Sequence, residues 1–449
     1  MAAPPECGAS PSARRSLSSA GFVQNGGMQG MPILRLALAI NLWLATPPGL
    51  AEGWQVGGHL KAQYSFTDYR SGDVAAFYGD DPAHDAALDA RLKAEWRAGF
   101  DFMAHYEALA LAGDSVATRR ALAGLGLFAS GTGTGLPDDR QRLLDLSDDF
   151  VAEDRAHAVH RLDRLAVGYG GEAGTLRLGR QAVSWGNGLA FQVLDFVNPF
   201  APLAIDKDYK TGEDMAYGQW QWVGKGDLQI MSLPRRDPVT RELDHERASH
   251  AVKLHARIAG FDLDTLAARH YDQDLLGFGA VRSVGGAVWR FDVLHTAVPS
   301  RDGVWSFLTN ADWSWVLFGK NMYGFIEYFR NGFGVYRDTD YLTLDPELTA
   351  RLARGELYSF GRDNAALGLQ IEFAPLLNGF ATLIQNLNDG SRFLQLRGVW
   401  DVRENLIVLA GFNLPSGERG SEYGGIPTPL PGTWLAPRRT LFARAAYYF

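Results

Sequence analysis

Ionisable side chains occupy every second position in several segments of the chain, and apolar side chains lie between them. The positions concerned are Lys93, Glu95, Arg97, Lys253, His255, Arg257, Arg290, Asp292, Arg397 and Asp401. Successive side chains of a strand point to opposite faces, so this spacing gathers the ionisable groups on one face. Such a face can hold carboxylates, phosphates or sugar acids through guanidinium and ammonium donors. The alternative is a wetted wall without a specific ligand.

Three of these residues, Lys253, His255 and Arg257, lie on one short segment and carry no acidic residue between them. On a strand they form a strip of positive charge. We expect this strip to face a water-filled lumen, where it attracts anionic solutes.

Catalytic or metal chemistry finds less support in the sequence. There is no nucleophile elbow, no His-Glu-x-x-His and no phosphate loop. His245, His250 and His255 suggest a metal site, but strand and loop residues with ordinary roles explain them better. The only cysteine, Cys7, lies in a segment that we expect to be removed. The sequence therefore predicts neither an enzyme nor a metal or cofactor site, although an outer-membrane enzyme stays open as a minor alternative.

The elements that position the ionisable residues are strands. Residues 92–110 alternate strictly between apolar and ionisable or small side chains, with a turn expected near Ala98-Gly99. The pattern recurs in the segments 251–258, 287–294, 365–373 and 394–401. One face is charged and the other is apolar and rich in aromatic residues, which is typical of a membrane barrel with a polar lumen.

The connections between the expected strands alternate in length. Short ones contain Gly171, Gly224, Gly260, Gly286 and Gly319; long polar ones cover about 113–157, 183–212, 235–248, 331–360 and 414–438. Short periplasmic turns and long extracellular loops are typical of outer-membrane barrels. The fold class is therefore all-β: one transmembrane antiparallel barrel over 52–449 with about 18 strands, 16 being the alternative.

Composition agrees with this fold class. The 449 residues are 46% hydrophobic, but no apolar run of about 18 residues follows the N-terminal region. The net charge of -8 argues against a nucleic-acid partner. Residues 31–51 carry Arg35, a short apolar stretch and Pro47-Pro48, which predicts a cleaved signal peptide within a leader over 1–51.

Two loop features are also predicted. The acidic residues between Asp138 and Asp154 lack the spacing of a calcium loop, so we interpret them as a solvated loop. Asp345-Pro346 begins a segment that we expect to form a short helix ending near Arg354, because Asp caps helices and proline suits their first turn.

The last strand, Thr440 to Phe449, resembles the C-terminal strand of Gram-negative outer-membrane barrels. Its apolar face ends in Tyr447 and Phe449, at the last and third-last positions that the barrel-assembly machinery reads in that family. The family often has glycine five residues before the terminal aromatic, where this chain has Arg444. The resemblance implies insertion into the outer membrane with lipid and lipopolysaccharide as neighbours.

A second resemblance covers residues 174–223. Leu176 to Gln181, Trp185 to Gly188, Asn198 to Pro202 and Asp206 to Lys210 look like a segment of porin and alginate-export-like barrels, in which a Gly-Arg-Gln strand end precedes a long loop. The candidates for the mouth and a constriction loop are Arg177, Arg180, Trp185, Asn198 and Phe200. Arg177 and Arg180 lie on opposite faces of a regular strand, so one of them is expected to point inward. We expect Trp185 at the membrane interface, and the loop around Phe200 either folded into the barrel or packed on its rim.

These patterns predict an outer-membrane channel that passes a polar or anionic solute, such as a sugar, a sugar acid or a polyanion, by passive diffusion or export. The passage of such solutes is implied by the resemblance to porins. A barrel that binds or transports an apolar small molecule is the main alternative, and a structural or adhesive barrel is a third.

Overall fold

The computed structural model describes residues 53–449 except 125–134, 223, 300 and 338–340. The expected leader over 1–51, with its signal peptide, lies outside the described residues. The described part forms one compact unit, Gly53–Phe449.

Long antiparallel strands make up most of this unit. They are β1 (Trp54–Asp68), β2 (Ala83–Ala98), β3 (Phe100–Gly113), β4 (Ser147–Glu153), β5 (Ala156–Gly171), β6 (Gly174–Gln181), β7 (Glu213–Trp222), β8 (Gly226–Arg236), β9 (Leu243–Ile258), β10 (Phe261–His270), β11 (Gln273–Val284), β12 (Ala287–Thr296), β13 (Val304–Leu317), β14 (Lys320–Arg330), β15 (Asp363–Ala374), β16 (Leu377–Asn386), β17 (Arg392–Arg403), β18 (Leu406–Ser416) and β21 (Arg439–Tyr448). The short β19 (Ile426–Pro427) and β20 (Trp434–Leu435) pair with each other in a connection. The sequence predicted this all-β class from alternation alone, and the prediction is confirmed.

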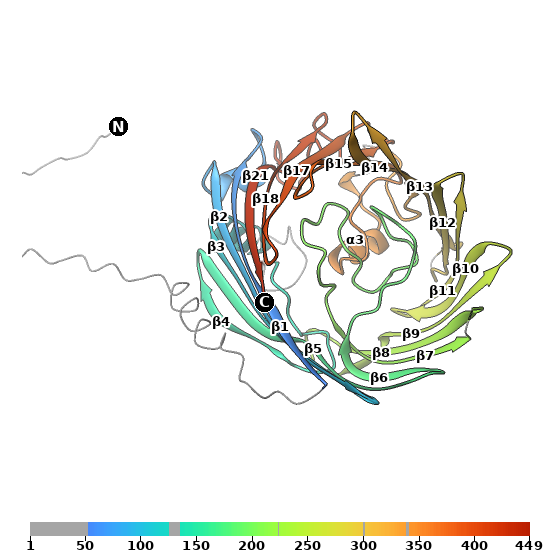
Figure 1. The fold of residues 1–449 in the computed structure, drawn as a ribbon. Helices are drawn as coiled ribbons and strands as arrows, with labels where there is room; N and C mark the ends of the chain where they lie inside the picture. The colour runs from blue at the N-terminus through green and yellow to red at the C-terminus, as the bar shows by residue number, and fades with distance from the viewer. Residues whose placement is uncertain (1–52, 125–134, 223, 300, 338–340) are drawn as a thin grey trace, which may run out of the picture. The chain divides into compact units, whose positions relative to one another are not determined.

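The strands close into a barrel (Figure 1). Consecutive strands pair, and β21 closes the ring by pairing with β1 from His59–Tyr448 to Asp68–Arg439. The sheet has 19 strands, of which β4 pairs only with one end of β5, so 18 form the closed ring. The predicted strand number of 18 is therefore confirmed. Closure gives each of the 18 ring strands a partner on both edges, as a sheet in a lipid bilayer requires.

The two faces of the wall differ in chemistry. Trp220, Trp222, Leu176, Val167 and Tyr169 are about half exposed on the outer face. Ionisable residues of the opposite parity, discussed below, are buried although they are polar. The apolar exterior therefore matches a lipid environment, and the interior holds the charges.

Most connections follow the predicted pattern of short turns and long loops, with three corrections. The connection between β10 and β11, on the long-loop side, contains only Tyr271 and Asp272, and β4 lies within the loop expected over 113–157. The loop expected over 235–248 occupies only 237–242, because β8 and β9 extend further than the alternation indicated. The other long connections contain the 3-10 helix η1 (Val74–Phe77), α2 (Asp114–Gly124) and α3 (Pro346–Ala353). The predicted cap of α3 is present, since the Asp345 side chain accepts a hydrogen bond from the Glu347 amide. Among the described residues, no helix is long and apolar enough to span a membrane.

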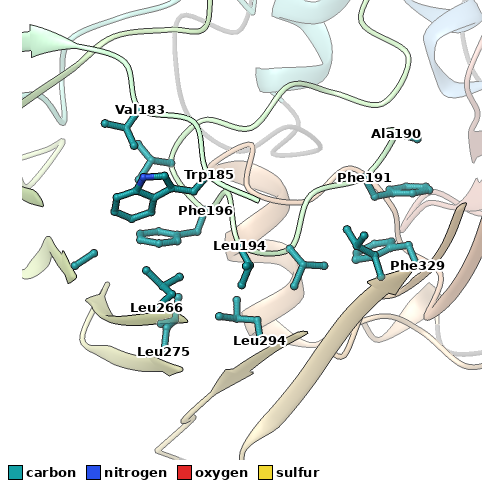
Figure 2. Packing of buried hydrophobic residues seen from close by; sticks show 14 of the residues in the cluster. Val183, Trp185, Ala190, Phe191, Leu194, Phe196, Leu266, Leu275, Leu294 and Phe329 are labelled. Atoms are coloured by element: carbon teal, nitrogen blue, oxygen red, sulfur yellow. The ribbon is translucent and has the colours of Figure 1, made fainter. Parts of the chain in front are cut away.

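The main hydrophobic cluster lies inside the ring rather than between layers of secondary structure. Its residues come from the connection between β6 and β7 and from the inward faces of the wall strands (Figure 2). Phe191 stacks on Phe329 of β14 with ring centroids 4.7 Å apart, and Leu194, Leu266 and Leu294 pack nearby. The barrel interior is therefore partly filled by its own chain.

Candidate functional site: the inner loop and the lumen

The connection between β6 and β7, residues 182–212, lies within the ring of strands, and we call it the inner loop (Figure 1). Its side chains and peptide groups contact strands on several sides of the barrel. These contacts place residues 182–212 across the lumen, so any solute that passes through must pass beside them.

One carboxylate of the wall holds the start of the inner loop through its backbone. Glu327 on β14 accepts hydrogen bonds from the amides of Leu189, Ala190 and Phe191 at 2.7–3.1 Å, and a fourth from Asn310 Nδ2 at 3.0 Å. Its residue exposure is only 1%. Loss of this buried carboxyl group would leave several donors without an acceptor, so it is a firm anchor.

A second wall carboxylate repeats this arrangement on β12. Asp292 accepts from the Asn187 amide at 2.7 Å and from Asn187 Nδ2 at 2.6 Å. Gly186 has φ +88, a backbone conformation that glycine adopts without strain. A Cβ at Gly186 would lie 3.3 Å from Asp292 Oδ2, so glycine also allows the close approach of loop and wall.

Apolar packing covers these anchors. Trp185 and Phe196 lie side by side with ring centroids 5.9 Å apart, and Leu194 packs against the wall strands (Figure 2). The indole of Trp185 donates to Gln229 Oε1 of β8 at 2.6 Å. Trp185 is only 5% exposed, so its predicted position at the membrane interface is wrong: it belongs to the interior cluster.

The later part of the inner loop is held by ion pairs instead. Lys61 Nζ of β1 lies 2.6 Å from Asp206 and 2.7 Å from Asp208. Arg444 Nη1 of β21 lies 2.7 Å from Asp206, and Tyr448 Oη donates to Asp208 at 2.7 Å. Arg444 is the residue that departs from the usual C-terminal pattern, and its contact with Asp206 gives this departure a structural role.

Tyr209 extends this charged contact to β2. The guanidinium of Arg91 lies 4.2 Å from the centre of the Tyr209 ring, and Lys93 Nζ lies 5.5 Å from it. Cations over an aromatic face are attracted by its electron density. Lys93, predicted to line the lumen, therefore faces the inner loop.

Lys210 joins the two parts of the inner loop. Its Nζ lies 2.5 Å from Asp195 Oδ1 and donates to the carbonyl of Val183 at 2.5 Å. Burial raises the pKa of Asp195 to about 6 despite the opposing charge of Lys210. Burial also lowers the pKa of Lys210.

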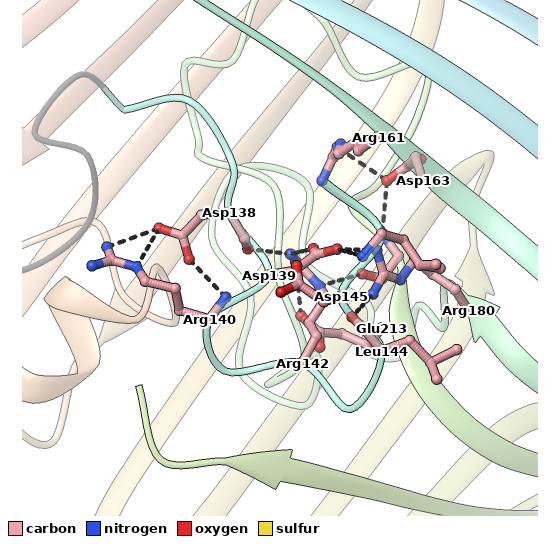
Figure 3. A network of polar contacts seen from close by, with 12 residues as sticks. Asp138, Asp139, Arg140, Arg142, Leu144, Asp145, Arg161, Asp163, Arg180 and Glu213 are labelled. Atoms are coloured by element: carbon pink, nitrogen blue, oxygen red, sulfur yellow. Dashed lines mark hydrogen bonds and ion pairs between the residues drawn. The ribbon is translucent and has the colours of Figure 1, made fainter. Parts of the chain in front are cut away.

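Arg180 at the end of β6 is only 1% exposed, and its polar contacts are drawn in Figure 3. Its Nη1 lies 2.7 Å from Asp139, its Nε lies 2.8 Å from Asp214, and its Nη2 donates to the Leu144 carbonyl at 2.7 Å. Burial would raise the pKa of Asp139, but the charges of Arg180 and Arg142 outweigh it and hold that pKa below its ordinary value. Arg180 therefore fastens the connection between β3 and β4 inside the barrel.

Arg177 and Arg180 have different surroundings. Arg177 lies 3.7 Å from Asp101, which shares the inward face of β3 with His105. Gly179, with φ +114, separates Arg180 from Leu178, which is 51% exposed on the outer face. Arg177 therefore faces the interior, and Arg180 is enclosed by the connection between β3 and β4.

The Lys253–His255–Arg257 strip is not an unpaired positive surface. Lys253 Nζ lies 3.1 Å from Asp264 Oδ1, and His255 Nδ1 lies 3.0 Å from the same oxygen. Arg257 Nε donates to Asp262 Oδ1 at 2.8 Å. The alternation within residues 251–258 could not predict these partners, because they belong to the neighbouring strand β10.

The other predicted lumen residues are also mostly paired. Glu95 lies 2.8 Å from Arg97 Nη2 and 3.0 Å from His105 Nε2. Arg290 pairs with Asp312 of β13, and Asp292 binds the inner loop as described above.

Arg397 of β17 is different. Its Nη1 donates to the Ile205 carbonyl at 3.4 Å and its guanidinium lies 4.6 Å from the centre of the Phe380 ring. Within the described part of the chain, no carboxylate lies at ion-pair distance from Arg397. Asp401 is half-buried nearer the short-turn end of the same strand.

Two cavities adjoin the inner loop on the long-loop side. The larger has a volume of about 420 Å³ and the smaller about 270 Å³, and both are lined by Asn198, Arg354 and Gly355. Phe200 lines the smaller cavity. Asn198 Nδ2 donates to Glu213 Oε1 at 2.7 Å, so the predicted mouth residues Asn198 and Phe200 lie together beside open space.

Neither Glu327 nor the buried pair of Arg142 with Glu213 was identified from the sequence. The inward face of β14 carries Phe325, Glu327 and Phe329, so its alternation with the apolar outer face is faint. Among the described residues, no group of three His, Cys, Asp or Glu is placed to hold a metal ion.

No protein-family model and no curated protein matches the sequence. Solved structures share its fold. Pseudomonas aeruginosa OccK9 (OpdG) is 13% identical with a TM-score of 0.50, over 89% of this chain and 99% of that chain. A BenF-like porin from Pseudomonas fluorescens Pf-5 is 9% identical with a TM-score of 0.49, over 89% and 100%. Acinetobacter baumannii OccAB4 is 8% identical with a TM-score of 0.49, over 90% and 99%.

The fold is an all-β, closed antiparallel barrel of 18 strands, which matches the fold of outer-membrane porins. At such low identity the likeness extends to the fold alone.

Proposed function

We propose that the protein is a channel of the Gram-negative outer membrane through which small polar solutes, among them sugars and sugar acids, diffuse passively. The observation that carries this proposal is the inner loop, which crosses a closed barrel and is anchored to its wall at Glu327 and Asp292 on one side and at Lys61 and Arg444 on another. A structural or adhesive barrel does not require a loop that is fixed inside its lumen.

Polar solutes are favoured over apolar ones by the placement of the aromatic side chains. Trp185, Phe191 and Phe196 of the inner loop are at most 6% exposed because they pack against the wall. The larger cavity beside the loop is lined largely by charged and amide side chains, whereas the smaller one also has the rings of Phe200, Tyr209 and Tyr358 in its lining. The larger cavity therefore suits a polar solute better than an apolar one.

We further propose that the ionisable residues predicted from alternation line the solute path, together with a compact cluster on β2, β3 and β5. That cluster joins three guanidinium groups, Arg91, Arg161 and Arg164, to the carboxylates Glu107 and Asp163. The excess positive charge favours anions modestly. Passage of a polyanion and the alginate-export-like resemblance remain predictions from the sequence, and a polymer would require a path wider than the anchored loop suggests.

We also propose that the expected signal peptide directs export of the chain and that Tyr447 and Phe449 act as its signal for barrel assembly. In the outer membrane the barrel then contacts lipopolysaccharide. On the outer face Tyr447 is 41% exposed and Phe449 38% exposed, which leaves both rings accessible to lipid. No catalytic step is part of this function.

Single-channel conductance of the refolded mature chain in a planar bilayer, with a salt gradient, tests the proposal. We expect stable open steps with a weak anion preference, and Arg397→Gln should reduce that preference. A correctly folded, heat-modifiable barrel that gives no open steps would overturn the channel function.

A further inference from the structure

The two cavities beside the inner loop, of about 420 and 270 Å³, share Asn198, Arg354 and Gly355 in their lining, and we call them together the mouth site. Small-molecule sites typically span about 300–1,000 Å³, so the mouth site has room for a solute of one or two sugar rings. The polar groups that line the mouth site indicate which chemical class of solute it can bind.

Every acidic side chain that lines the mouth site is already paired with a guanidinium. Arg142 lies 3.2 Å from Glu213 and also 2.8 Å from Asp139. Arg354 makes two hydrogen bonds to Glu356, at 2.5 and 3.0 Å. The positive and negative charges are thus interleaved along the lining rather than separated.

Of the two remaining guanidinium groups, one has a carboxylate partner and the other does not. Arg140 Nη2 lies 2.9 Å from Asp138. Arg235 donates to Ser249 Oγ at 2.6 Å and stacks over the Tyr271 ring at 4.6 Å. The lining of the two cavities holds five cations and four carboxylates, so its charge is balanced to within one unit; the cations are Arg140, Arg142, Lys210, Arg235 and Arg354, and the carboxylates are Asp138, Asp206, Glu213 and Glu356.

Donors and acceptors nevertheless remain open toward the cavity. In the described part of the chain, Asn198 Oδ1, Glu213 Oε2 and Arg354 Nη1 take part in no hydrogen bond within the protein. They are also not among the polar atoms shut off from solvent. Acceptors and a donor therefore lie around one space, with Asn198 at a positive φ of 48° between them.

We propose that the mouth site binds an uncharged, hydroxyl-rich solute, a neutral mono- or disaccharide, before it passes the inner loop. A sugar hydroxyl donates and accepts at once, so it satisfies a carboxylate and a neighbouring guanidinium together without breaking their ion pair. A carboxylate solute would lose its hydration and meet guanidinium groups of which all but Arg235 are already paired with a carboxylate. This inference rests on the channel function proposed above and narrows its solute class.

The experiment compares cellobiose with its acid, cellobionate, as blockers of single-channel current through the full barrel. We expect cellobiose to block in a concentration-dependent manner and at a half-blocking concentration no higher than that of cellobionate. Asn198→Ala and Arg354→Gln should each raise the half-blocking concentration of cellobiose about tenfold, the loss expected for one good hydrogen bond. Arg439→Gln, on β21 beside Asp68 and outside the lining of both cavities, is the matched control and should leave it unchanged.

Two results would overturn the mouth site while leaving the channel intact: a much tighter block by cellobionate, or a cellobiose block that Asn198→Ala does not weaken. If the wild-type barrel is folded but silent, the channel function fails. Calorimetric titration of the detergent-folded barrel with cellobiose then decides the mouth site on its own, because a lack of heat in that titration would reject it.

Discussion

The two ends of the inner loop are anchored to the barrel wall by different kinds of interaction. Around residues 185–197, peptide amides and apolar rings are buried against the wall, and the anchoring Glu327 is 1% exposed. Around residues 203–210, the anchors are ion pairs, and the Asp206 and Asp208 side chains remain 27% and 41% exposed. We call these the buried anchor and the charged anchor.

The difference matters because solvent screens exposed charges but not buried ones. Ion pairs with exposed partners contribute roughly 0–1 kcal/mol and weaken with salt. Removal of a buried carboxylate that accepts several amide hydrogen bonds costs far more stability, because its donors are left without partners. If the inner loop moves as solutes pass, we expect it to detach from the wall at the charged anchor first.

Removal of the Glu327 carboxylate should have the largest effect. Glu327→Ala leaves three backbone amides without their acceptor and removes one of the two acceptors of Asn310 Nδ2, at a cost on the order of 3–5 kcal/mol. We expect a larger and noisier single-channel conductance, because the buried anchor detaches. Glu372→Gln, which alters a carboxylate near the short-turn end beside Asn321, is the matched control. An unchanged conductance in Glu327→Ala would show that Glu327 does not hold the loop.

Truncation of the stacked ring tests the apolar part of the same anchor. Phe191→Ala removes the partner of Phe329, and buried phenylalanine-to-alanine changes cost about 3–5 kcal/mol when the site cannot collapse. Because the Glu327 hydrogen bonds to the backbone remain, we expect a smaller rise in conductance than in Glu327→Ala. A cysteine at Phe200, in a chain whose only natural cysteine is Cys7, reports loop release through its rate of labelling by a bulky thiol reagent. Equal labelling of the wild-type and Phe191→Ala backgrounds would count against this packing as an anchor.

The contrast between the two anchors also explains which parts of the fold and of the site could be predicted from the sequence. Strict alternation in 92–110 and the rhythm of short and long connections predicted the barrel, because every wall residue faces either lipid or lumen. The same rule failed where the lumen is not wet: beneath the buried anchor, Leu266, Leu294 and Phe329 point inward, and the two faces look alike. Pairing was invisible for a related reason, since the partners of Lys253 and Arg257 lie on another strand. Trp185 was misplaced because an indole suits a membrane interface and a loop core equally well.

Disruption of the charged anchor should give a smaller effect that depends on salt. Lys61→Gln removes the cation shared by Asp206 and Asp208, while Arg444 still holds Asp206. We expect faster labelling of a cysteine at Phe200 at 0.05 M salt, by a factor of about five, which corresponds to roughly 1 kcal/mol. At about 1 M salt the wild type and Lys61→Gln should converge, because the Debye length falls to about 3 Å. A difference that persists at high salt would mean that the contact is as shielded as the buried anchor.

Acidity should act on the loop in two opposite steps. Burial raises the pKa of Asp195 to about 6, so its contribution to the docked loop is full below its ordinary pKa near 4 and is lost as the pH rises through 6. Acidification from pH 7 to 5 should therefore tighten the loop slightly.

Asp206 has the opposite sign. Burial alone would raise its pKa, but the hydrogen bond and charge of Lys61 outweigh burial and hold the pKa below its ordinary value. Its contribution is present above about pH 4 and disappears as the pH falls through the lowered pKa. Labelling at a Phe200 cysteine should consequently be slowest near pH 5 and rise on both sides, once the rates are corrected for the reactivity of the thiol with a short model peptide. Asp206→Asn should abolish the rise on the acid side alone, and an acid-side rise that survives in Asp206→Asn would assign the loosening to another group.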